Sequence, residues 1–535
     1  MTTPGGSYDA IVIGAGHNGL VAAAYLARAG LSVLALERRH LVGGCCVTEE
    51  LWPGFRSSRA AYVASLIRPA ILKDLRLESH GLKLLPRQPS SFTPLPDGRH
   101  LLLGSDAAEN HREVAKFSRR DAEALPRYEA MLERAARLIE PFLDRPPIDP
   151  HGLRLSDWAA LASVGWKALR SRSLLDIAEL LGAPARPILE RWFECEALRA
   201  TLATDSIIGA LVSPSTPGSA YVLLHHVMGD AGGARGVWAY VQGGMGAFAE
   251  AIHSSARALG VRVETGAEAA RILLKDGRAT GVALADGREV RGRLVLSCAD
   301  PRVTFLRLLG PSDLPEDFRR RVEAIDFSAA SAKINLALDR LPRFTARPEG
   351  AGDRELRGTI HLSPTLDFIE KAYLDAVRGE PSKQPIVEMT IPSTVDGSLA
   401  PPGKHVASMF VQYAPARLTG GASWDDPGLK EKFAESVFAV IEEYAPGFRA
   451  SILHHEVLSP LDLERIFGLT GGNIFHGAMA PHQLFFLRPV PGWARYRTPV
   501  PGLYLCGAGT HPGGGIMGAC GRNAATEALR VWRRG

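Results

Sequence analysis

The first forty residues combine two short apolar runs with an alanine-rich segment between them. Residues 9–14 (DAIVIG) form an apolar, β-branched run that ends in glycine, which is typical of a buried parallel strand. Residues 20–28 (LVAAAYLAR) favour a helix that ends at Gly30, and residues 31–36 predict a second strand that closes with Glu37. The pattern therefore predicts a strand–helix–strand unit, which requires a parallel sheet.

The rest of the chain predicts a long helical region followed by strands of two sheets. Residues 86–231 have mainly helical patterns, with helices expected at 121–143, 155–172, 173–181 and 187–204. A helix at 247–259 follows, and then short strands at 261–264, 269–275, 279–285 and 294–297 with Asp-Gly turn signals among them. A second sheet is expected from strands at 332–338, 387–390 and 406–412. A helix at 429–444, a strand at 502–506 and a helix at 517–532 complete the chain.

Composition excludes several classes of protein. Apolar residues make up 46% of the 535 residues and charged residues 22%, which are ordinary values for a globular protein. A chain of this length has about two to four domains. The net charge of +5 is too small to indicate nucleic-acid binding. No apolar run reaches the ~18 residues of a membrane span.

Cysteine usage and the N-terminal residues predict a cytoplasmic location. The six cysteines include no C-x-x-C pair, which favours a reducing compartment over a disulfide scaffold. Residues 1–8 lack the features of a secretory signal and the arginine-rich pattern of a transit peptide. We therefore expect a cytoplasmic protein that is soluble or that contacts a membrane only at its periphery.

A glycine-rich motif lies in the context that dinucleotide binding requires. Residues 14–19 (GAGHNG) follow the first predicted strand and open the predicted helix. Gly14 permits the tight turn, Gly16 lets a pyrophosphate approach the backbone, and Gly19 allows the helix to pack closely on the sheet. Glu37 comes 18 residues after Gly19, where its carboxylate can accept hydrogen bonds from ribose hydroxyls. We therefore expect a dinucleotide whose phosphates bind at the helix N-terminus.

Two further segments favour FAD over NAD(P). Gly43-Gly44 forms a second loop that can meet a long dinucleotide, and Arg39 can add positive charge there. Residues 502–523 (GLYLCGAGTHPGGGIMGACGRN) predict another strand, glycine-rich turn and helix. Gly507 and Gly518 of this segment are expected beside the flavin, where a helix N-terminus attracts anions.

Several stretches of the chain resemble a known group of flavoproteins. The N-terminal motif, residues 243–246 (GGMG) and the tail GAGTHPGGG look like those of the carotenoid/retinoid oxidoreductases, a family that includes phytoene desaturases. Further stretches that carry the resemblance run nearly end to end, at 15–26, 202–210, 213–229, 463–476 and 505–525. The resemblance implies non-covalent FAD. The resemblance also implies that mitochondrial members carry an N-terminal presequence, and because residues 1–8 show no such pattern, we expect that location not to transfer.

The same resemblance implies the fold class. We expect an α/β protein in which a Rossmann-like FAD-binding domain of the glutathione-reductase/amine-oxidase type is interleaved with an α+β substrate domain. The FAD-binding domain is expected at residues 1–85, 232–304 and 456–535, and the substrate domain at residues 86–231 and 305–455.

Three other motifs point away from rival chemistries. Residues 243–246 resemble a second nucleotide loop, but Ala249 occupies the position of its third glycine, so an NAD(P) site is the less favoured alternative. Disulfide reductases need two cysteines separated by four residues after the glycine pair, and here Cys46 is followed by Leu51 at the second position. The consecutive residues His225 and His226 rarely share a face, which argues against a metal site.

The catalytic candidates come from the resemblance and from position along the chain. Flavin oxidation of a C–H bond requires a protein to hold the donor carbon, exclude water and tune charge. Lys333 is similar in placement to the lysine that amine oxidases hold near the reactive flavin nitrogen. Asn473 and His476 lie in a glycine-rich run similar to a substrate-facing segment of desaturases, and His511 follows the flavin-side strand. Ala269 is expected to contact the adenine through its backbone, because we expect its strand beside the helix that follows residues 243–246.

These observations favour an FAD-dependent oxidoreductase. We expect it to oxidise or desaturate an apolar small molecule by hydride transfer to the flavin, with oxygen or a quinone as electron acceptor. A flavin-dependent amine oxidase is the rival enzyme, and an FAD-loaded regulatory or interaction protein with little turnover is the rival of a different class. Residues 158–181 carry Trp158 and Trp166, and they can form either an amphipathic face on a membrane or, as we favour, a packed helix of the substrate domain.

Overall fold

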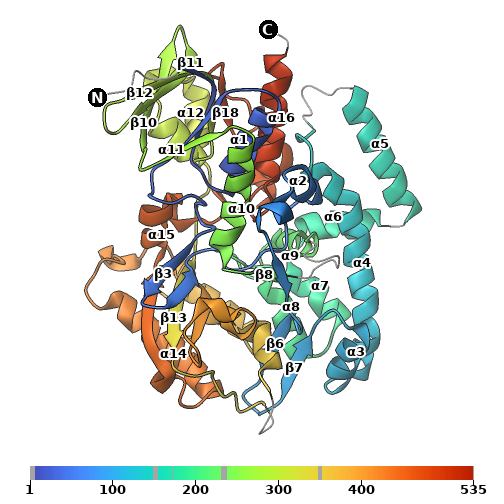
Figure 1. Ribbon diagram of the computed structural model, residues 1–535. Helices are drawn as coiled ribbons and strands as arrows, with labels where there is room; N and C mark the ends of the chain where they lie inside the picture. The colour runs from blue at the N-terminus through green and yellow to red at the C-terminus, as the bar shows by residue number, and fades with distance from the viewer. Residues whose placement is uncertain (1–6, 149–154, 172, 230–237, 348–351, 534–535) are drawn as a thin grey trace.

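The computed structural model describes residues 7–148, 155–171, 173–229, 238–347 and 352–533. Two seven-stranded sheets occupy opposite ends of the molecule, and a layer of helices runs along one side of both (Figure 1). The chain crosses between the two ends several times, as the alternation of colours in Figure 1 shows. This arrangement confirms the expected α/β fold class.

The upper sheet in Figure 1 is built on parallel strands. In spatial order its strands are β10 (Ala269–Lys275), β11 (Arg278–Leu284), β12 (Glu289–Ser297), β1 (Ser7–Ile13), β2 (Val33–Glu37) and β9 (Arg262–Thr265), and β18 (Leu503–Leu505) also pairs with β12. β1 runs parallel to β2 and β12, whereas β10 and β11 form an antiparallel excursion. The predicted strand–helix–strand unit is therefore confirmed as β1, α1 (His17–Arg28) and β2.

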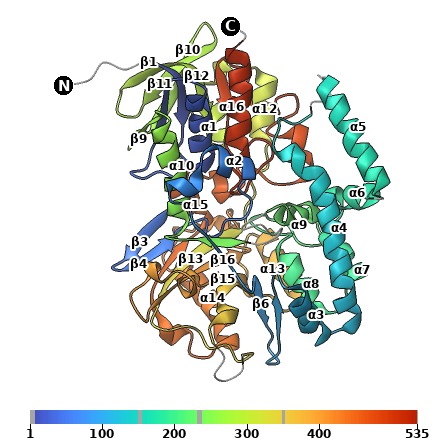
Figure 2. The same cartoon turned by 45° about the vertical axis from the view of Figure 1, so that its right-hand side comes forward.

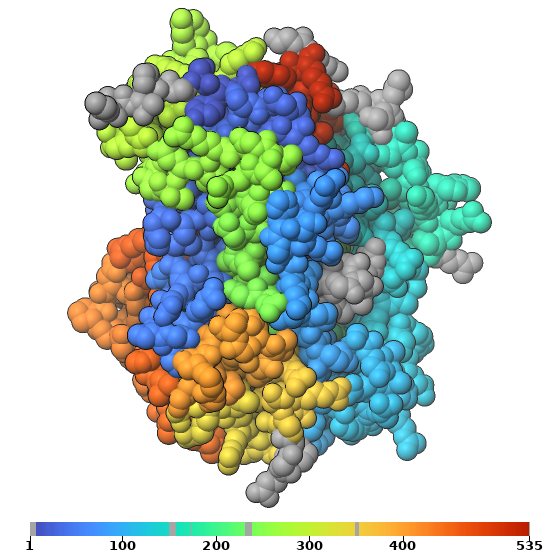
Figure 3. Space-filling view, in the orientation of Figure 1, coloured from blue at the N-terminus to red at the C-terminus, as the bar shows by residue number. Residues whose placement is uncertain are grey.

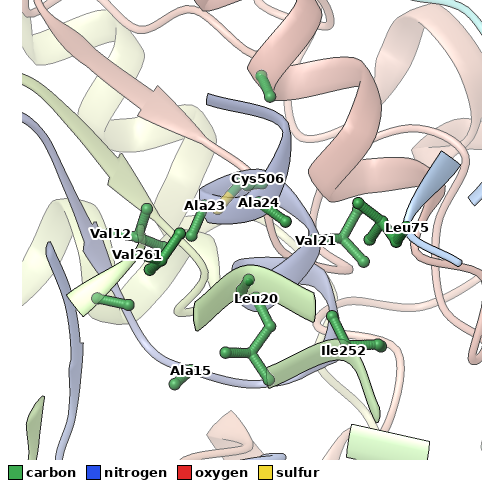
Figure 4. Close-up of a cluster of buried hydrophobic side chains, with 14 of the residues drawn as sticks. Val12, Ala15, Leu20, Val21, Ala23, Ala24, Leu75, Ile252, Val261 and Cys506 are labelled. Carbon is green, nitrogen blue, oxygen red and sulfur yellow. The ribbon is translucent and has the colours of Figure 1, made fainter. Parts of the chain in front are cut away.

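Helices cover both faces of this sheet. One face packs against α1, α10 (Met245–Ala258) and α16 (Ala519–Trp532), and the other against α11 (Pro301–Leu306) and α12 (Glu316–Glu323). Successive side chains of β1 alternate between the two cores, because Val12 belongs to the first cluster and Ile11 to the second. Figure 4 shows Val12 near Ala23 of α1, a small residue that lets the helix approach the sheet closely.

The lower sheet is mostly antiparallel and has one apolar and one polar face. Its strands are β17 (Ile452–Leu458), β13 (Ser331–Leu338), β16 (His405–Gln412), β15 (Ile386–Thr390), β14 (Thr359–Leu362), β6 (Ser91–Pro94) and β7 (His100–Leu103). In β13, Ile334 and Leu336 belong to the apolar core with α14 (Leu429–Tyr444), while Lys333 and Asn335 point to the opposite face. Both kinds of side chain are buried, so this sheet presents buried polar groups to the rest of the molecule.

The helical layer consists of α3 (Ala107–Ala115), α4 (Arg119–Leu143), α5 (Leu155–Arg170), α6 (Leu174–Gly182), α7 (Ala185–Trp192), α8 (Glu196–Thr204), α9 (Ser219–Val227) and α13 (Leu366–Val377). The helix expected at 187–204 is wrong, because α7 and α8 are separate. The buried carboxylate of Asp121 accepts hydrogen bonds from the backbone N–H groups of Glu194 and Cys195, which stabilises the break between them. This tertiary contact overrides the helical pattern of the sequence.

Shorter elements connect the two ends. After β2 the chain forms the hairpin β3 (Thr48–Trp52) and β4 (Phe55–Ser58) and then the helix α2 (Pro69–Asp74). The helix α15 (Pro460–Phe467) precedes β18. β5 (Leu84–Pro86) pairs with β8 (Ala239–Val241), close to the two expected domain junctions near residues 85 and 232. Within the described residues, no helix combines the length and hydropathy that spanning a bilayer requires.

Candidate functional site

A cavity of about 580 Å³ lies at the carboxyl ends of β1 and β2. Ligands of open α/β sheets bind at this edge, outside the carboxyl ends of the strands. The residues that line the cavity come from segments far apart in the sequence, within 13–18, 36–45, 267–270, 298–308, 464–476 and 508–516. The cavity is large enough for most of a dinucleotide, and it unites the N-terminal and C-terminal glycine-rich segments.

The β1–α1 turn leaves its backbone open to an anion. Gly14 has a φ of 90°, which L side chains rarely adopt, and a Cβ atom at Gly19 would lie 2.0 Å from the carbonyl oxygen of Gly14. A Cβ atom at Gly16 would meet nothing closer than 3.8 Å, the Cα atom of Gly44. Among the residues that the structure describes, no side chain caps α1, and its first turn holds no acidic residue, so its N-terminal N–H groups remain available to phosphate oxygens.

Glu37 and Arg39 lie at the end of β2 and line the same cavity. Glu37 is buried, and its carboxylate accepts hydrogen bonds from the backbone N–H groups of Ala15 (2.9 Å) and Arg39 (3.0 Å). The Arg39 guanidinium bonds to the Glu49 carboxylate at 3.0 Å and lies over the Phe467 ring, while its Nη1 atom has no hydrogen-bond partner. The positive charge of Arg39 is therefore held in place by Glu49.

Ala269 reaches the cavity by a route that the sequence did not indicate. We expected its strand beside the helix that follows residues 243–246, but β10 lies at the far edge of the sheet from β9. The connection between β9 and β10 instead passes the end of β2, where Gly266 and Ala267 donate to the carbonyl oxygens of Arg39 and Glu37. This path places Ala269 in the cavity lining.

The C-terminal loop contributes Ala508, Gly515 and Ile516 to the cavity, whereas Gly507 and Gly518 are outside its lining. A Cβ atom at Gly507 would lie 2.3 Å from the carbonyl oxygen of Cys298, and one at Gly518 would lie 2.7 Å from the Ile71 side chain. The structure therefore gives these two glycines packing roles.

Two histidines of the cavity lining carry buried nitrogens without a hydrogen-bond partner, His17 at Nε2 and His476 at Nδ1. Burial lowers the pKa of His17 to about 4, and burial also lowers the pKa of His476, so both rings are neutral at neutral pH. His476 was expected from the sequence, but His17 was missed because it occupies a variable position of the glycine motif. The sequence did offer one signal for His17: a histidine at the first position of the predicted helix, next to the expected phosphate site.

Lys333 lies outside the cavity lining but is fully enclosed. Its amino group donates to the Ser408 hydroxyl and lies 4.0 Å from the centre of the Tyr62 ring. Burial lowers the pKa of Lys333 well below its usual value. Ala61, next to Tyr62, donates its N–H to the carbonyl oxygen of Cys45, which lines the cavity. Lys333 is therefore linked to the cavity wall through Tyr62.

Asn473 and His511 are buried but do not line the cavity. Asn473 donates to the carbonyl oxygen of Ser328 and accepts from the N–H groups of Phe475 and Gly477, so it holds the shape of its own loop. His511 Nε2 lies 2.9 Å from the carbonyl oxygen of Phe142 in α4, and burial lowers the pKa of His511 to about 4.

The second glycine loop, residues 243–246, has its backbone N–H groups occupied. Gly243 donates to the Asp396 carboxylate, Met245 to the Ser58 hydroxyl and Gly246 to the Thr48 hydroxyl. A phosphate would have to displace all three contacts. The structure therefore argues against an NAD(P) site at this helix N-terminus.

Cys45 and Cys46 do not form the dithiol that a disulfide reductase needs. All six cysteines are free. Burial raises the pKa of Cys45 to about 12 and that of Cys46 well above its usual range, so neither is a thiolate at neutral pH. Cys46 packs in the upper core with its Sγ atom 3.8 Å from His17 Nδ1.

Comparison with known proteins places this geometry in a family. The family model of flavin containing amine oxidoreductases matches residues 19–372. The rat protein named pyridine nucleotide-disulfide oxidoreductase domain-containing protein 2 is 52% identical, over 98% of this chain and 93% of its own length. A phytoene desaturase (lycopene-forming) from Pseudescherichia vulneris is 27% identical, over 97% of this chain and 98% of its own.

The solved structure of wild-type putrescine oxidase bound to putrescine superimposes with a TM-score of 0.62 at 16% identity, over 99% of this chain and 100% of that one. This likeness shows the fold. The sequence matches confirm the resemblance to phytoene desaturase-related flavoproteins, and the family implies a flavin cofactor.

Proposed function

The chain belongs to the family of flavin containing amine oxidoreductases, and on that premise we propose that it is an FAD-dependent oxidoreductase of an apolar small molecule. One observation carries the proposal. The strand–turn–helix motif, the Gly43-Gly44 loop and the C-terminal glycine loop line a single cavity of about 580 Å³. The relative named for phytoene desaturation supports an apolar substrate.

The residues present fit FAD. The space at Gly16 that a Cβ would fill, the uncapped α1 N-terminus and the facing Gly44 suit a pyrophosphate. Glu37 suits the ribose, and the backbone at Ala269 suits the adenine. The unpartnered nitrogens of His17 and His476 are available for polar atoms of the cofactor or the substrate.

When bound in this cavity, FAD would supply the hydride acceptor, with oxygen or a quinone as the final electron acceptor. The chain itself excludes water with buried side chains and holds polar groups in fixed positions. Burial disfavours the charged form of the Lys333 side chain, so its amino group, hydrogen-bonded to Ser408, is suited to accept a proton at Nζ.

Amine oxidation is the second candidate, and one observation favours it: Lys333 is buried beside an aromatic ring rather than solvated at a strand end. Anaerobic mixing of the FAD-loaded protein with different donors distinguishes the candidate functions. Bleaching by polyenes or lipids supports our proposal, and bleaching by amines supports amine oxidation. Tight partner capture without bleaching by any donor supports an interaction protein.

Replacing Lys333 by methionine is expected to slow flavin reduction about 100-fold with the bleaching donor, because a general base contributes that much or more. Flavin content should not change, since Lys333 is outside the cavity lining. Stopped-flow absorbance measures the rate, and Lys432→Met on the exposed face of α14 is the control. An unchanged reduction rate in Lys333→Met would leave Lys333 only a structural role.

We also propose that the protein works in a reducing compartment such as the cytoplasm, because its cysteines are unbridged.

We further propose that the protein contacts membranes through α5 and α6. Figures 1 and 2 show α5 at the edge of the molecule, outside α4, and Figure 3 shows this segment projecting. Large apolar side chains are exposed there, which goes against the packed helix that the sequence favoured, namely Trp158, Leu161, Trp166, Leu169, Leu174 and Leu175. Lys167 and Arg170 lie in the last turn of α5, where they complement anionic headgroups. An interfacial face of this kind gives an apolar substrate a direct route to the enzyme.

The double change Trp158→Ser, Trp166→Ser is expected to weaken vesicle binding about tenfold, because each tryptophan is more than half exposed, at 58% and 65%. Co-sedimentation with vesicles of phosphatidylcholine and phosphatidylglycerol measures the effect. Leu374→Ser, at an exposed leucine of α13, is the matched control. Absence of vesicle binding by the unchanged protein would exclude membrane contact through this face.

A further inference from the structure

A second cavity, of about 180 Å³, lies on the polar face of the lower sheet, against α8. Cross-strand neighbours His361 on β14 and Glu388 on β15 form part of its floor, and Tyr62 and Arg87 line its sides. Thr201 of α8 and Asp205, which ends that helix, complete the polar lining. None of these buried polar groups lines the first cavity.

Arg87 brings a permanent positive charge into this cavity. Its side chain is 4% exposed, and a guanidinium stays protonated at any physiological pH. It donates from Nε to the carbonyl oxygen of Trp238 (3.2 Å) and from Nη1 to the Thr359 hydroxyl (2.6 Å). Among the residues that the structure describes, no carboxylate forms an ion pair with it. A buried charge without a counter-ion is costly, which favours an anionic partner from outside the chain.

The carboxyl groups of the second cavity also favour an anionic ligand. Oε1 of Glu388 is buried without a hydrogen-bond partner and lies 3.8 Å from His361 Nδ1. Burial raises the pKa of Glu388 to about 8 and raises that of Asp205, while it lowers the pKa of His361 to about 3. At neutral pH Glu388 is therefore mostly a protonated donor, and Ser91 offers a second unpartnered hydroxyl.

The second cavity adjoins the first across a thin wall. Tyr62 lines the second cavity, and its ring lies under the Lys333 amino group. Ile208 also lines it and packs in the same apolar cluster as Ile474, which lines the first cavity. A Cβ atom at Gly209 would lie 2.3 Å from the Ile474 side chain, which shows how closely the two walls approach.

We propose that this second cavity binds a carboxylate group of the substrate, with Arg87 as its cation and Glu388 as a hydrogen-bond donor. The inference rests on the proposed function and narrows it: the substrate has an apolar body, which extends past Ile208 towards the cofactor cavity, and a carboxylate head. The rival occupant, an ammonium group, would need both acids ionised beside a guanidinium that cannot lose its charge.

The first test measures binding without turnover. Isothermal titration of the FAD-loaded protein with butyrate, butylamine and butanol is expected to show binding of butyrate only. Arg87→Gln should weaken butyrate binding about 30-fold or more, because truncating one partner of a buried charge pair has effects of that size. Arg99→Gln, at an exposed arginine that pairs with Asp97, is the matched control and should leave the affinity unchanged.

The second test uses pH and does not depend on the folding of Arg87→Gln. The groups that face Glu388 are His361, Asp205, Arg87 and Tyr62, and burial keeps His361 and Tyr62 neutral between pH 6.5 and about 9. As the pH rises through about 8, Glu388 loses its proton and repels the carboxylate, so butyrate affinity should fall about tenfold. Glu388→Gln keeps the shape and cannot ionise, and its affinity should be independent of pH over this range.

Each other outcome overturns the inference. Butylamine binding that strengthens above pH 8 would assign the cavity to an ammonium group, and equal binding of butanol would assign it to neutral polar molecules. No binding of butyrate to a protein that holds FAD would exclude a carboxylate subsite. Because these titrations do not involve flavin reduction, a protein that bleaches with a donor but ignores butyrate refutes only this inference. A protein that binds butyrate but is never bleached refutes only the proposed oxidation.

Discussion

Replacing Gly16 by alanine is expected to give a folded but colourless protein. The backbone at Gly16 is extended, with φ −67° and ψ 168°, which any residue adopts, and a Cβ atom there would meet no protein atom closer than 3.8 Å. The methyl group would instead occupy the space through which a pyrophosphate reaches the N–H groups of α1. We expect the flavin content per protein to fall at least tenfold, because close phosphate contacts require the bare backbone.

Visible absorbance of the purified variant gives the flavin content, and thermal unfolding after removal of flavin shows whether the fold is intact. Gly165→Ala, at an exposed glycine of α5 with open space around it, is the control and should remain yellow. Gly19→Ala is the informative contrast, because its Cβ would lie 2.0 Å from a backbone oxygen and should disturb folding itself. A Gly16→Ala protein with full flavin content would refute our placement of the cofactor.

The sequence predicted the upper sheet well because its signals are local. A β-branched run, a glycine turn and an alanine-rich helix are adjacent in the chain, so their pattern reports their structure directly. The second glycine loop, by contrast, resembles a nucleotide site in sequence, and only the structure shows its N–H groups bound to Asp396, Ser58 and Thr48. A local sequence pattern predicts local structure. Whether a backbone N–H group is free to bind a ligand depends on residues that are distant in the sequence.

The polar face of the lower sheet is a second feature that local sequence patterns do not predict. Residues 331–338 (SAKINLAL) alternate between polar or small and larger apolar side chains, which sequence reasoning normally assigns to a solvent-exposed face. Here the face that carries Lys333 and Asn335 is buried against the other half of the molecule. An alternating pattern distinguishes the two faces of a strand, but it does not show what covers each face. The second cavity, with Arg87 and Glu388, therefore could not be predicted from the sequence.

Arg488 is another residue whose role depends on contacts distant in sequence, and its removal is expected to have the largest effect on stability. The guanidinium is buried between two loops of the C-terminal region. It donates hydrogen bonds to a set of backbone carbonyl oxygens, those of Phe475, Gly477, Ala478, Gln483 and Ala508. Burial lowers its pKa to about 10, so it remains charged at neutral pH. His476 and Ala508, which line the cofactor cavity, lie within the loops that this one side chain ties together.

Arg488→Met is expected to lower the free energy of unfolding by about 4 kcal/mol, because the carbonyl oxygens lose their donors while still buried. Urea unfolding of the FAD-loaded protein measures the change. Arg488→Lys keeps the charge but lacks the planar set of five N–H donors, so it should recover only part of the loss. Arg319→Met removes an exposed pair with Glu323 on α12 and should cost at most about 0.5 kcal/mol. If Arg488→Met unfolds at the same urea concentration as Arg319→Met, water replaces the guanidinium at these carbonyls and the loops are held by their apolar contacts alone.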